Sequence, residues 1–283
     1  MAWKLTGDVE EFLARAEGFL CADPVANTVP LTVTKAIRTL GPGLYPKALF
    51  GWWTAGGDVA GTCVWTGPYP VLLSAMPGPA ASELAEVLAG REPAVPGVNG
   101  TQETAENFAD AWTRRTGSPA RVARHERLHR LAGLDMPDPP PEGAARVADV
   151  GDQDLVRDWY AAFRRDAGGH GDPNTAMIDG RLAEGGIVLW EAGGRPVALA
   201  GRTPAIAGTA RVAPVYTPAE HRRRGYGAAV TAAVTRAAQD AGAEEVVLFT
   251  DLANPTSNSV YHRLGYRPVE DRLVLAFPSP TRP

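Results

Sequence analysis

The chain has 283 residues, enough for one or two domains, and 45% of them are hydrophobic. Its formal net charge of −4 gives no overall attraction to nucleic acid or to an anionic membrane. The sequence lacks a secretory signal at its start, and no apolar run approaches the roughly 18 residues that span a bilayer. We therefore expect a cytoplasmic protein with no nucleic-acid or membrane partner. Cys21 and Cys63 lie too far apart for a metal or redox motif, and no metal site is expected.

The clearest boundary in the chain is the proline-rich stretch 136–143. Clustered prolines donate no backbone hydrogen bonds and hold the chain extended. We predict a linker at residues 134–145, which separates a first domain at 1–133 from a second domain at 146–283.

The two halves repeat one order of predicted elements. Each begins with an amphipathic helix and continues with two strands joined by a Gly-Gly turn and with further strand. A helix, a strand, a helix and a closing strand follow. The elements that mark the repeat are the helices at 9–20 and 152–165, the turns at Gly56-Gly57 and Gly193-Gly194, and the closing strands at 121–131 and 272–277. The alternative is that the first half is an unrelated α/β domain.

In the second half, residues 211–217 have the composition of a strand but include Pro214. A proline inside a strand indicates a bulge or a free edge, since it has no N–H to donate. A bulge would leave backbone groups open to an extended ligand that carries amides. The alternative is an ordinary edge strand.

The next feature is a turn rich in arginine and glycine, which leads into a helix that ends at Gly242. Gly225 and Gly227 stand at the start of that helix, where backbone N–H groups bind anions. Three consecutive arginines, at 222–224, would attract a diphosphate. The alternative is a capped helix beside a solvated arginine run. A Rossmann site is excluded because the third glycine and the acidic residue after the next strand are missing.

A second short helix is predicted to follow Asn254-Pro255 and to end at Gly265. Tyr261 falls two helical turns after Asn254, on the same face. The combination indicates a pocket for a phosphate-bearing cofactor with a tyrosine hydroxyl at its far end. The alternative is a core tyrosine with a satisfied hydroxyl.

These two motifs resemble the cofactor-binding core of the GNAT superfamily of acyl-CoA-dependent N-acyltransferases. The pattern [Q/R]-x-x-G-x-[G/A] is matched by Arg222, Gly225 and Gly227. The pattern N-x-x-[A/S]-x-x-x-Y, followed by G-[F/Y], is matched by Asn254, Ser257, Tyr261 and Gly265-Tyr266. The resemblance covers residues 145–283, whereas the first half has Ala75-Met76-Pro77-Gly78-Pro79 in place of the arginine and glycine motif.

The resemblance implies an α/β fold of two GNAT-like domains in tandem, the first a degenerate copy. Each would have a mixed, largely antiparallel sheet flanked by helices, with a splayed central pair of strands. The cofactor would be acetyl-CoA, and Tyr261 would protonate the leaving thiolate. The implied cofactor-binding residues are Val215, Tyr216, Thr217, Arg222, Arg223, Arg224, Gly225, Tyr226, Gly227, Ala228, Asn254 and Ser257.

The general base is not identified by the resemblance. The positions where family members carry a glutamate are Arg211 and Phe249 in this chain. Asp251 shares the strand face of Phe249 and is a candidate base, with a turn cap as the alternative. The acceptor is expected near the first helix of the second half and the following loop, where His170 and Asp172 are candidate contacts.

The resemblance therefore implies an acetyl-CoA-dependent N-acetyltransferase that acts on a primary amine of a small molecule or peptide. The alternative is a non-catalytic acyl-CoA-binding or sensing protein. A monomer or a homodimer is expected.

Overall fold

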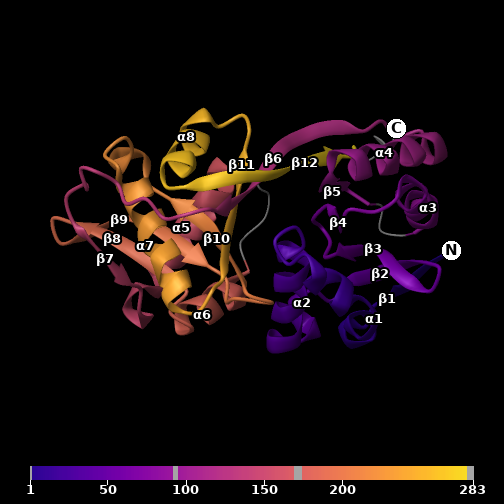
Figure 1. Ribbon diagram of the computed structural model, residues 1–283, viewed down its shortest axis with the longest axis horizontal. Helices are drawn as coiled ribbons and strands as arrows, with labels where there is room; N and C mark the ends of the chain where they lie inside the picture. Colours follow the sequence, from indigo (N-terminus) through magenta and orange to yellow (C-terminus); the bar gives the residue numbers. More distant parts are fainter. Residues whose placement is uncertain (1, 92–94, 169–173, 279–283) are drawn as a thin grey trace. The chain divides into compact units, whose positions relative to one another are not determined.

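The computed structural model describes residues 2–91, 95–168 and 174–278 (Figure 1). The chain forms two compact units. Unit 1 consists of Met1–Leu128, Thr250–Ala253 and Val269–Pro283, and unit 2 of His129–Phe249 and Asn254–Pro268. Each unit is thus assembled from segments that are far apart in the sequence.

Unit 1 is built on a mixed sheet in the order β1-β2-β3-β4-β5-β12. Its strands are β1 (Ala2–Thr6), β2 (Leu49–Ala55), β3 (Asp58–Trp65), β4 (Val71–Leu73), β5 (Gly97–Thr101), most of β6 (Arg121–Leu131) and the end of β12 (Tyr266–Ala276). Its helices are α1 (Val9–Ala22), α2 (Thr28–Leu40), α3 (Gly78–Ala89) and α4 (Gln102–Thr116). β4 and β5 run parallel, and the β1–β2, β2–β3, β3–β4 and β5–β12 pairs are antiparallel.

Unit 2 has the strand order β7-β8-β9-β10-β11. The strands are β7 (Ala144–Val147), β8 (Ile187–Ala192), β9 (Arg195–Arg202), β10 (Thr209–Tyr216) and β11 (Glu245–Asp251). The helices are α5 (Gln153–Asp166), α6 (Thr175–Ala183), α7 (Tyr226–Asp240) and α8 (Pro255–Arg263). The β10–β11 pair is parallel, and the β7–β8, β8–β9 and β9–β10 pairs are antiparallel.

Both units therefore follow the same order, which is strand, two helices, three strands, helix, strand, helix. This arrangement confirms the predicted fold class, a largely antiparallel mixed sheet flanked by helices in each half. The sequence prediction lacked four elements of the repeat, namely β1, α2, β7 and α6. No helix in the described parts of the chain is long and apolar enough to cross a membrane.

Helices cover both faces of the unit 2 sheet. Alternate residues of each strand point to opposite faces and so pack against different helices. On β8, Val188 and Trp190 belong to the cluster that packs with α7, as do Ala198 and Ala200 of β9. The alternate residues of the same strands, including Ile187 and Leu199, join Val156 and Tyr160 of α5. Strands β8 and β9 are thus buried on both faces, by α7 on one side and by α5 on the other.

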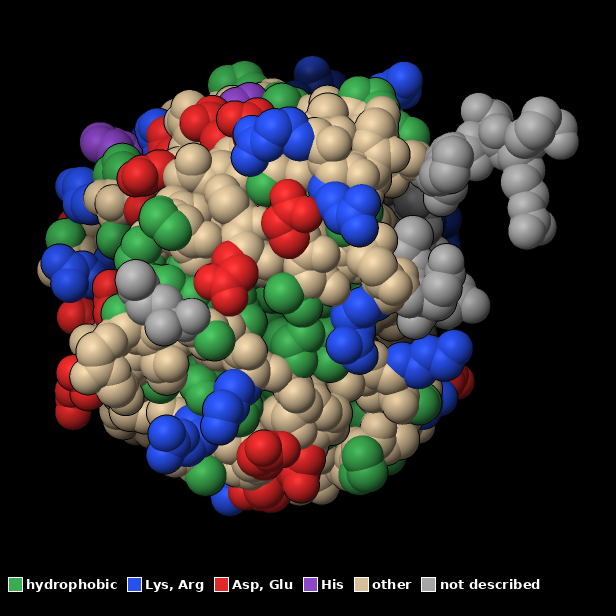
Figure 2. Space-filling view, turned by 90° about the vertical axis from the view of Figure 1, so that its right-hand side faces the viewer, with side chains coloured by type: hydrophobic (Ala, Val, Ile, Leu, Met, Phe, Trp, Pro, Cys, Tyr) green, Lys and Arg blue, Asp and Glu red, His purple; other side chains and the backbone are tan. Residues whose placement is uncertain are grey.

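Unit 1 buries two aromatic groups on its helices. Phe108 and Trp112 of α4 stack with Phe277, with ring centroids 5.0 to 6.1 Å apart, and Phe12 of α1 stacks on Phe50 of β2. On the face shown in Figure 2, basic and acidic side chains are interspersed rather than gathered by sign. That face shows no basic patch of the kind that binds nucleic acid.

Gly265, the glycine that follows α8, is held where no side chain fits. Its φ is +95°, and a Cβ at this position would lie 1.7 Å from the carbonyl oxygen of Gly133. The next residue, Tyr266, is fully buried, and its hydroxyl lies 2.6 Å from Oγ1 of Thr235. The glycine-tyrosine pair of the motif is therefore explained by packing.

We expect Gly265→Ala to lower the free energy of unfolding by about 2–4 kcal/mol, because the new methyl group would force the backbone to move. Gly242→Ala is the matched control, since Gly242 also has a positive φ of 89° but no heavy atom within 4 Å of the added Cβ. It should cost only about 1–2 kcal/mol for the unfavourable φ. Denaturant unfolding of both variants measures the difference, and equal losses would contradict the steric explanation.

Candidate active site

The strand β10 is interrupted at its proline. Its register with β9 shifts between Val212 and Val215, so that Ala213 and Pro214 form a bulge. On its other edge, β10 pairs with β11 only over Thr209–Arg211. In an antiparallel pair, alternate residues direct their N–H and C=O groups away from the partner strand. Past the bulge, some of these groups of β10 therefore face the edge that β11 no longer covers.

An arginine that the sequence did not single out stabilises the bulge. Nη1 of Arg181, on α6, donates a 2.6 Å hydrogen bond to the carbonyl oxygen of Ala213. Gly201 on β9 leaves space beside the bulge, where a Cβ would lie 2.9 Å from this oxygen and 2.6 Å from Oη of Tyr160. Tyr160 is buried, and its hydroxyl has no hydrogen-bond partner within the described residues.

The arginine and glycine turn follows β10. Nε of Arg222 donates to the carbonyl oxygen of Thr217 at 2.9 Å, and its Nη2 pairs with Asp166 at 2.6 Å. Arg223 has a φ of +63°, which is unusual for a residue with a side chain, and Gly225 has a φ of +84°. The first arginine thus holds the turn in shape through contacts with neighbouring segments of unit 2.

The helix α7 starts at this turn with an uncapped N-terminus. Its N-cap is Gly225, which offers no side-chain hydrogen bond, and the first intrahelical bond of the turn is donated by Ala229. The N–H groups of Tyr226–Ala228 belong to the first turn, where an α-helix supplies no acceptor. Arg223 and Arg224 are exposed nearby and have no ion-pair partner among the described side chains. The helix dipole and the arginine side chains therefore both make the electrostatic potential at the start of α7 positive.

Both glycines of the turn lie close to other segments. A Cβ at Gly227 would lie 3.4 Å from Oγ1 of Thr217, and a Cβ at Gly225 would lie 3.4 Å from Cβ of Pro141. The proline-rich segment thus packs against the turn within unit 2. A larger residue at either glycine would fill the space beside the helix N-terminus.

The helix α8 begins with a side-chain cap. Oδ1 of Asn254 accepts a 3.1 Å hydrogen bond from the backbone N–H of Ser257. Tyr261 follows two turns later and meets the ring of Tyr266 edge-on, with centroids 6.2 Å apart. Tyr261 is partly buried, and this desolvation raises the pKa of its phenol from 10 to about 12. The hydroxyl therefore keeps its proton at neutral pH.

Asp251, the candidate base, belongs to unit 1, whereas the other predicted site residues belong to unit 2. Its Oδ1 accepts a 2.8 Å hydrogen bond from the backbone N–H of Ala253. This is the geometry of an Asx turn, the alternative considered for this residue. The positions of the missing glutamates are occupied by Arg211, whose N–H bonds to Thr203, and by the apolar Phe249.

An open pocket of about 400 Å³ lies beside the turn in unit 2. It is lined by Asp158, Trp159, Ala161, Ala162 and Arg165 of α5, and by Tyr216, Pro218, Glu220 and His221 of the strand end and turn. The rings of Trp159 and Tyr216 are 6.0 Å apart and tilted by 60°. The pocket adjoins the region where the acceptor is predicted, although His170 and Asp172 lie outside the described residues.

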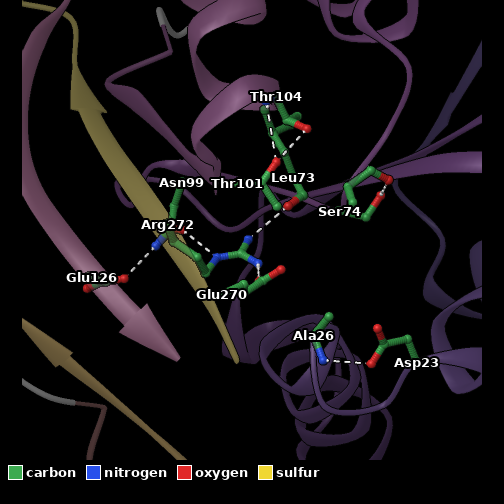
Figure 3. A network of polar contacts seen from close by, with 11 residues as sticks. Asp23, Ala26, Leu73, Ser74, Asn99, Thr101, Thr104, Glu126, Glu270 and Arg272 are labelled. Atoms are coloured by element: carbon green, nitrogen blue, oxygen red, sulfur yellow. Dashed lines mark hydrogen bonds and ion pairs between the residues drawn. The ribbon is translucent and has the colours of Figure 1, made fainter. Parts of the chain in front are cut away.

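Unit 1 has a different structure at the corresponding place. Its β4 and β5 are linked by Arg272, which donates to the carbonyl oxygen of Leu73 at 2.9 Å and to Asn99 at 3.2 Å, and pairs with Glu270 (Figure 3). Its α3 starts after Pro77 and has a second proline in the first turn. Since proline has no N–H, this helix start offers fewer donors to an anion than α7 does.

Comparison with known proteins agrees with the motifs. Residues 153–266 match the family model described as acetyltransferase (GNAT) family. This match confirms the resemblance inferred from the sequence over that part of the second half. A search of curated protein sequences finds no match.

Solved structures share the fold across both halves. A tandem GNAT protein from the clavulanic acid biosynthesis pathway is 13% identical, with a TM-score of 0.58, over 99% of this chain and 100% of that one. A Drosophila protein is 14% identical with a TM-score of 0.69, over 98% of each chain. A GCN5-related N-acetyltransferase from Kribbella flavida is 24% identical with a TM-score of 0.57, over 88% of this chain and 96% of that one. At these identities, the likeness concerns the fold alone.

The role of Arg181 can be measured through stability. Arg181→Gln would remove a charged hydrogen bond to the Ala213 carbonyl, and we expect the free energy of unfolding to fall by about 1.5–3 kcal/mol. Arg195→Gln, at an exposed position in the β8–β9 hairpin, is the control and should change it by less than about 0.5 kcal/mol. Equal effects in urea unfolding would show that Arg181 does not stabilise the bulge.

Proposed function

We propose that this chain, in which residues 153–266 form an acetyltransferase (GNAT) domain, is an acetyl-CoA-dependent N-acetyltransferase. Its acceptor would be a primary amine of a small molecule or peptide. The observation that carries the proposal is the uncapped N-terminus of α7 beside a strand whose outer edge is open. A helix start with free N–H groups and nearby arginines suits a diphosphate, and an open strand edge suits an extended chain of amides.

In this proposal, the diphosphate of the cofactor lies against the backbone amides of 223–228. Arg223 and Arg224 add charge, while Arg222 shapes the turn through Thr217 and Asp166. The pantetheine arm pairs with the backbone of 215–217, and Asn254 and Ser257 flank the arm from the start of α8. Only one unit would bind the cofactor, because Arg272 links the corresponding strands of unit 1.

The reaction joins the amine nitrogen to the thioester carbon. The neutral amine attacks the acetyl carbonyl, the C–S bond of the tetrahedral intermediate breaks, and the nitrogen loses a proton. We propose that a backbone N–H near Val215 stabilises the oxyanion. Tyr261 would donate its hydroxyl proton to the leaving thiolate and regain one from solvent. General acid catalysis of this kind contributes about 10²–10⁴-fold in rate.

The amine acceptor needs a group that takes up its proton. An ammonium group must lose a proton before it attacks, and neither Arg211 nor Phe249 can accept one. A water molecule would take it. Asp251 belongs to unit 1, and its Oδ1 accepts a hydrogen bond from the backbone N–H of Ala253.

The chain also suits a second candidate function. A protein that binds acyl-CoA without transferring its acyl group would need the helix N-terminus and the open strand edge, but not a base. The absence of carboxylates at 211 and 249 supports that alternative. Measurement of acyl transfer, rather than of cofactor binding, separates the two functions.

The helix N-terminus can be tested with Gly227→Asp. A carboxylate in the first turn of a helix interacts favourably with its dipole, so thermal stability should stay the same or rise. The same charge would repel the diphosphate, and we expect the dissociation constant for coenzyme A to rise at least about tenfold, which corresponds to about 1.4 kcal/mol. Calorimetric titration of both proteins measures the change. Unaltered affinity would exclude diphosphate binding at this site.

The role of Tyr261 can be tested with Tyr261→Phe, using thiol release from acetyl-CoA with a panel of amines. We expect kcat to fall by about 10²-fold or more, with little change in coenzyme A affinity. Tyr69→Phe in unit 1 is the control and should keep full activity. Equal rates near background for wild type and Tyr261→Phe would favour the binding protein over the enzyme.

The raised pKa of Tyr261 predicts a particular pH dependence. A phenol with a pKa of about 12 stays protonated to pH 10, where an ordinary tyrosine would be half ionised. With an aryl amine that is already neutral at pH 7, kcat should not decline between pH 8 and pH 10, provided that circular dichroism shows an intact fold. A decline centred near pH 10 that disappears in Tyr261→Phe would contradict the shift.

A further inference from the structure

The pocket beside α5 has a regular construction. Four of its lining residues, Asp158, Ala161, Ala162 and Arg165, are spaced three, four and seven positions apart, so they share one face of the helix. The two alanines lie between Asp158 and Arg165 in the sequence and line the same pocket. The Cα atoms of the two charged residues are separated by about 10 Å along the helix axis, since each residue advances 1.5 Å.

The charged groups of the pocket are unpaired, unlike their neighbours on the helix. Arg157 pairs with Asp179 and Asp166 pairs with Arg222, both at 2.6 Å. Asp158 and Arg165, in contrast, have no ion-pair partner among the described residues. Nδ1 of His221 is buried, lies on a residue that lines the pocket, and has no hydrogen-bond partner in the same set. The charges that face the pocket are thus available to a ligand.

The direction of α5 determines which of the two charged residues, Asp158 or Arg165, lies nearer the proposed reaction site. Tyr160, two residues after Asp158, lies beside the bulge, as the contacts of a Cβ at Gly201 show. Asp166, one residue after Arg165, is paired with the turn through Arg222. The acid of the pocket is therefore at the end nearer the bulge, and the base is at the end nearer the turn.

From this arrangement, we propose that the pocket binds the acceptor as an aromatic amino acid. The ammonium group would lie at Asp158, toward the bulge, and the ring would pack against Trp159 and Tyr216. The carboxylate would bind Arg165 and Nδ1 of His221. The inference rests on the proposed acetyltransferase function and specifies its acceptor. A volume of about 400 Å³ is within the range of about 300–1,000 Å³ typical of small-molecule sites.

The physical basis of this specificity is the pairing of both charges of the ligand. An arginine binds a carboxylate through paired N–H donors. Long side chains on a helix point toward its N-terminus, which for Arg165 is the direction of Asp158, so the distance that a ligand must bridge between the two charged groups is shorter than the distance between their Cα atoms. The aromatic walls add contact with a planar ring. Glu220 is exposed on the turn and opposes the carboxylate, so Arg165 and His221 together must outweigh it.

The test compares L-phenylalanine with L-phenylalaninamide, which keeps the amine and the ring but lacks the carboxylate. Calorimetric titrations are performed on the full chain saturated with coenzyme A. We expect the wild type to bind the acid at least about tenfold more tightly than the amide, and Arg165→Gln to abolish that preference without weakening the amide. Asp158→Asn should weaken both ligands alike. Arg236→Gln and Asp240→Asn, on the exposed face of α7, are the charge-matched controls and should retain wild-type binding.

Thiol release with the same two compounds, and with phenethylamine, separates this inference from the proposed function. Binding of the acid that depends on Arg165, without any thiol release, would support the pocket and overturn the transferase. Acetylation of phenethylamine or of the amide as efficient as that of the acid would overturn the pocket and support the transferase. A preference for the acid that persists in Arg165→Gln would also overturn the inference.

Discussion

The site in unit 2 depends on a single missing hydrogen-bond donor. Pro214 stands within β10 where a strand residue would offer an N–H, and the register with β9 shifts at this point. Beyond the bulge, β10 and β11 no longer pair, although they run parallel over the preceding residues. The bulge is in turn fixed from the helical layer by Arg181, which binds the carbonyl oxygen that the distortion exposes. The open stretch of β10 is therefore maintained by packing and by one charged hydrogen bond.

The other part of the site relies on backbone groups rather than side chains. Helices α1, α4, α6 and α8 each begin with a side chain that accepts a hydrogen bond from the first turn. The helix α7 begins with Gly225, which offers no acceptor and adopts a left-handed conformation. Its first N–H groups therefore receive no acceptor from the N-cap side chain, as is also the case in α2, α3 and α5, and the turn before α7 is contacted by Arg222 and Pro141. A backbone site of this kind needs little rearrangement when an anion binds.

Local patterns allowed the bulge in β10 and the starts of α7 and α8 to be predicted from the sequence. The signals used were local, because each depends on neighbours within a few residues. They are Pro214, the two glycines of the turn, and the spacing of Asn254 and Tyr261, and all can be recognised in a single sequence. The repeat of elements was also detectable, because hairpin turns and helical spacing recur in both halves. The short strand β7 and the helix α6 were missed because their apolar periodicity is brief.

Contacts between distant segments could not be predicted in this way. Arg181 and Ala213 are 32 residues apart, and Arg222 and Asp166 are 56 residues apart, so no local pattern connects them. Tyr160 falls within the helix predicted at 152–165, but its position beside the bulge depends on how α5 packs on β9 and β10. For Asp251, the sequence supported both a base and a turn cap, and the bond from Ala253 shows that the carboxylate does take part in a turn.

The composition of the two units has a consequence for the order in which the chain folds. Strand β5 of unit 1 pairs with residues 272–276 of β12, and Arg272 donates hydrogen bonds to Leu73 of β4 and to Asn99 of β5. Asn99 of β5 and Arg272 of β12 are 173 residues apart in the sequence. Domains usually fold from the N-terminal side during synthesis. In this protein, β5 can pair with β4 early, but its other edge stays unpaired until residues 272–276 have been synthesised.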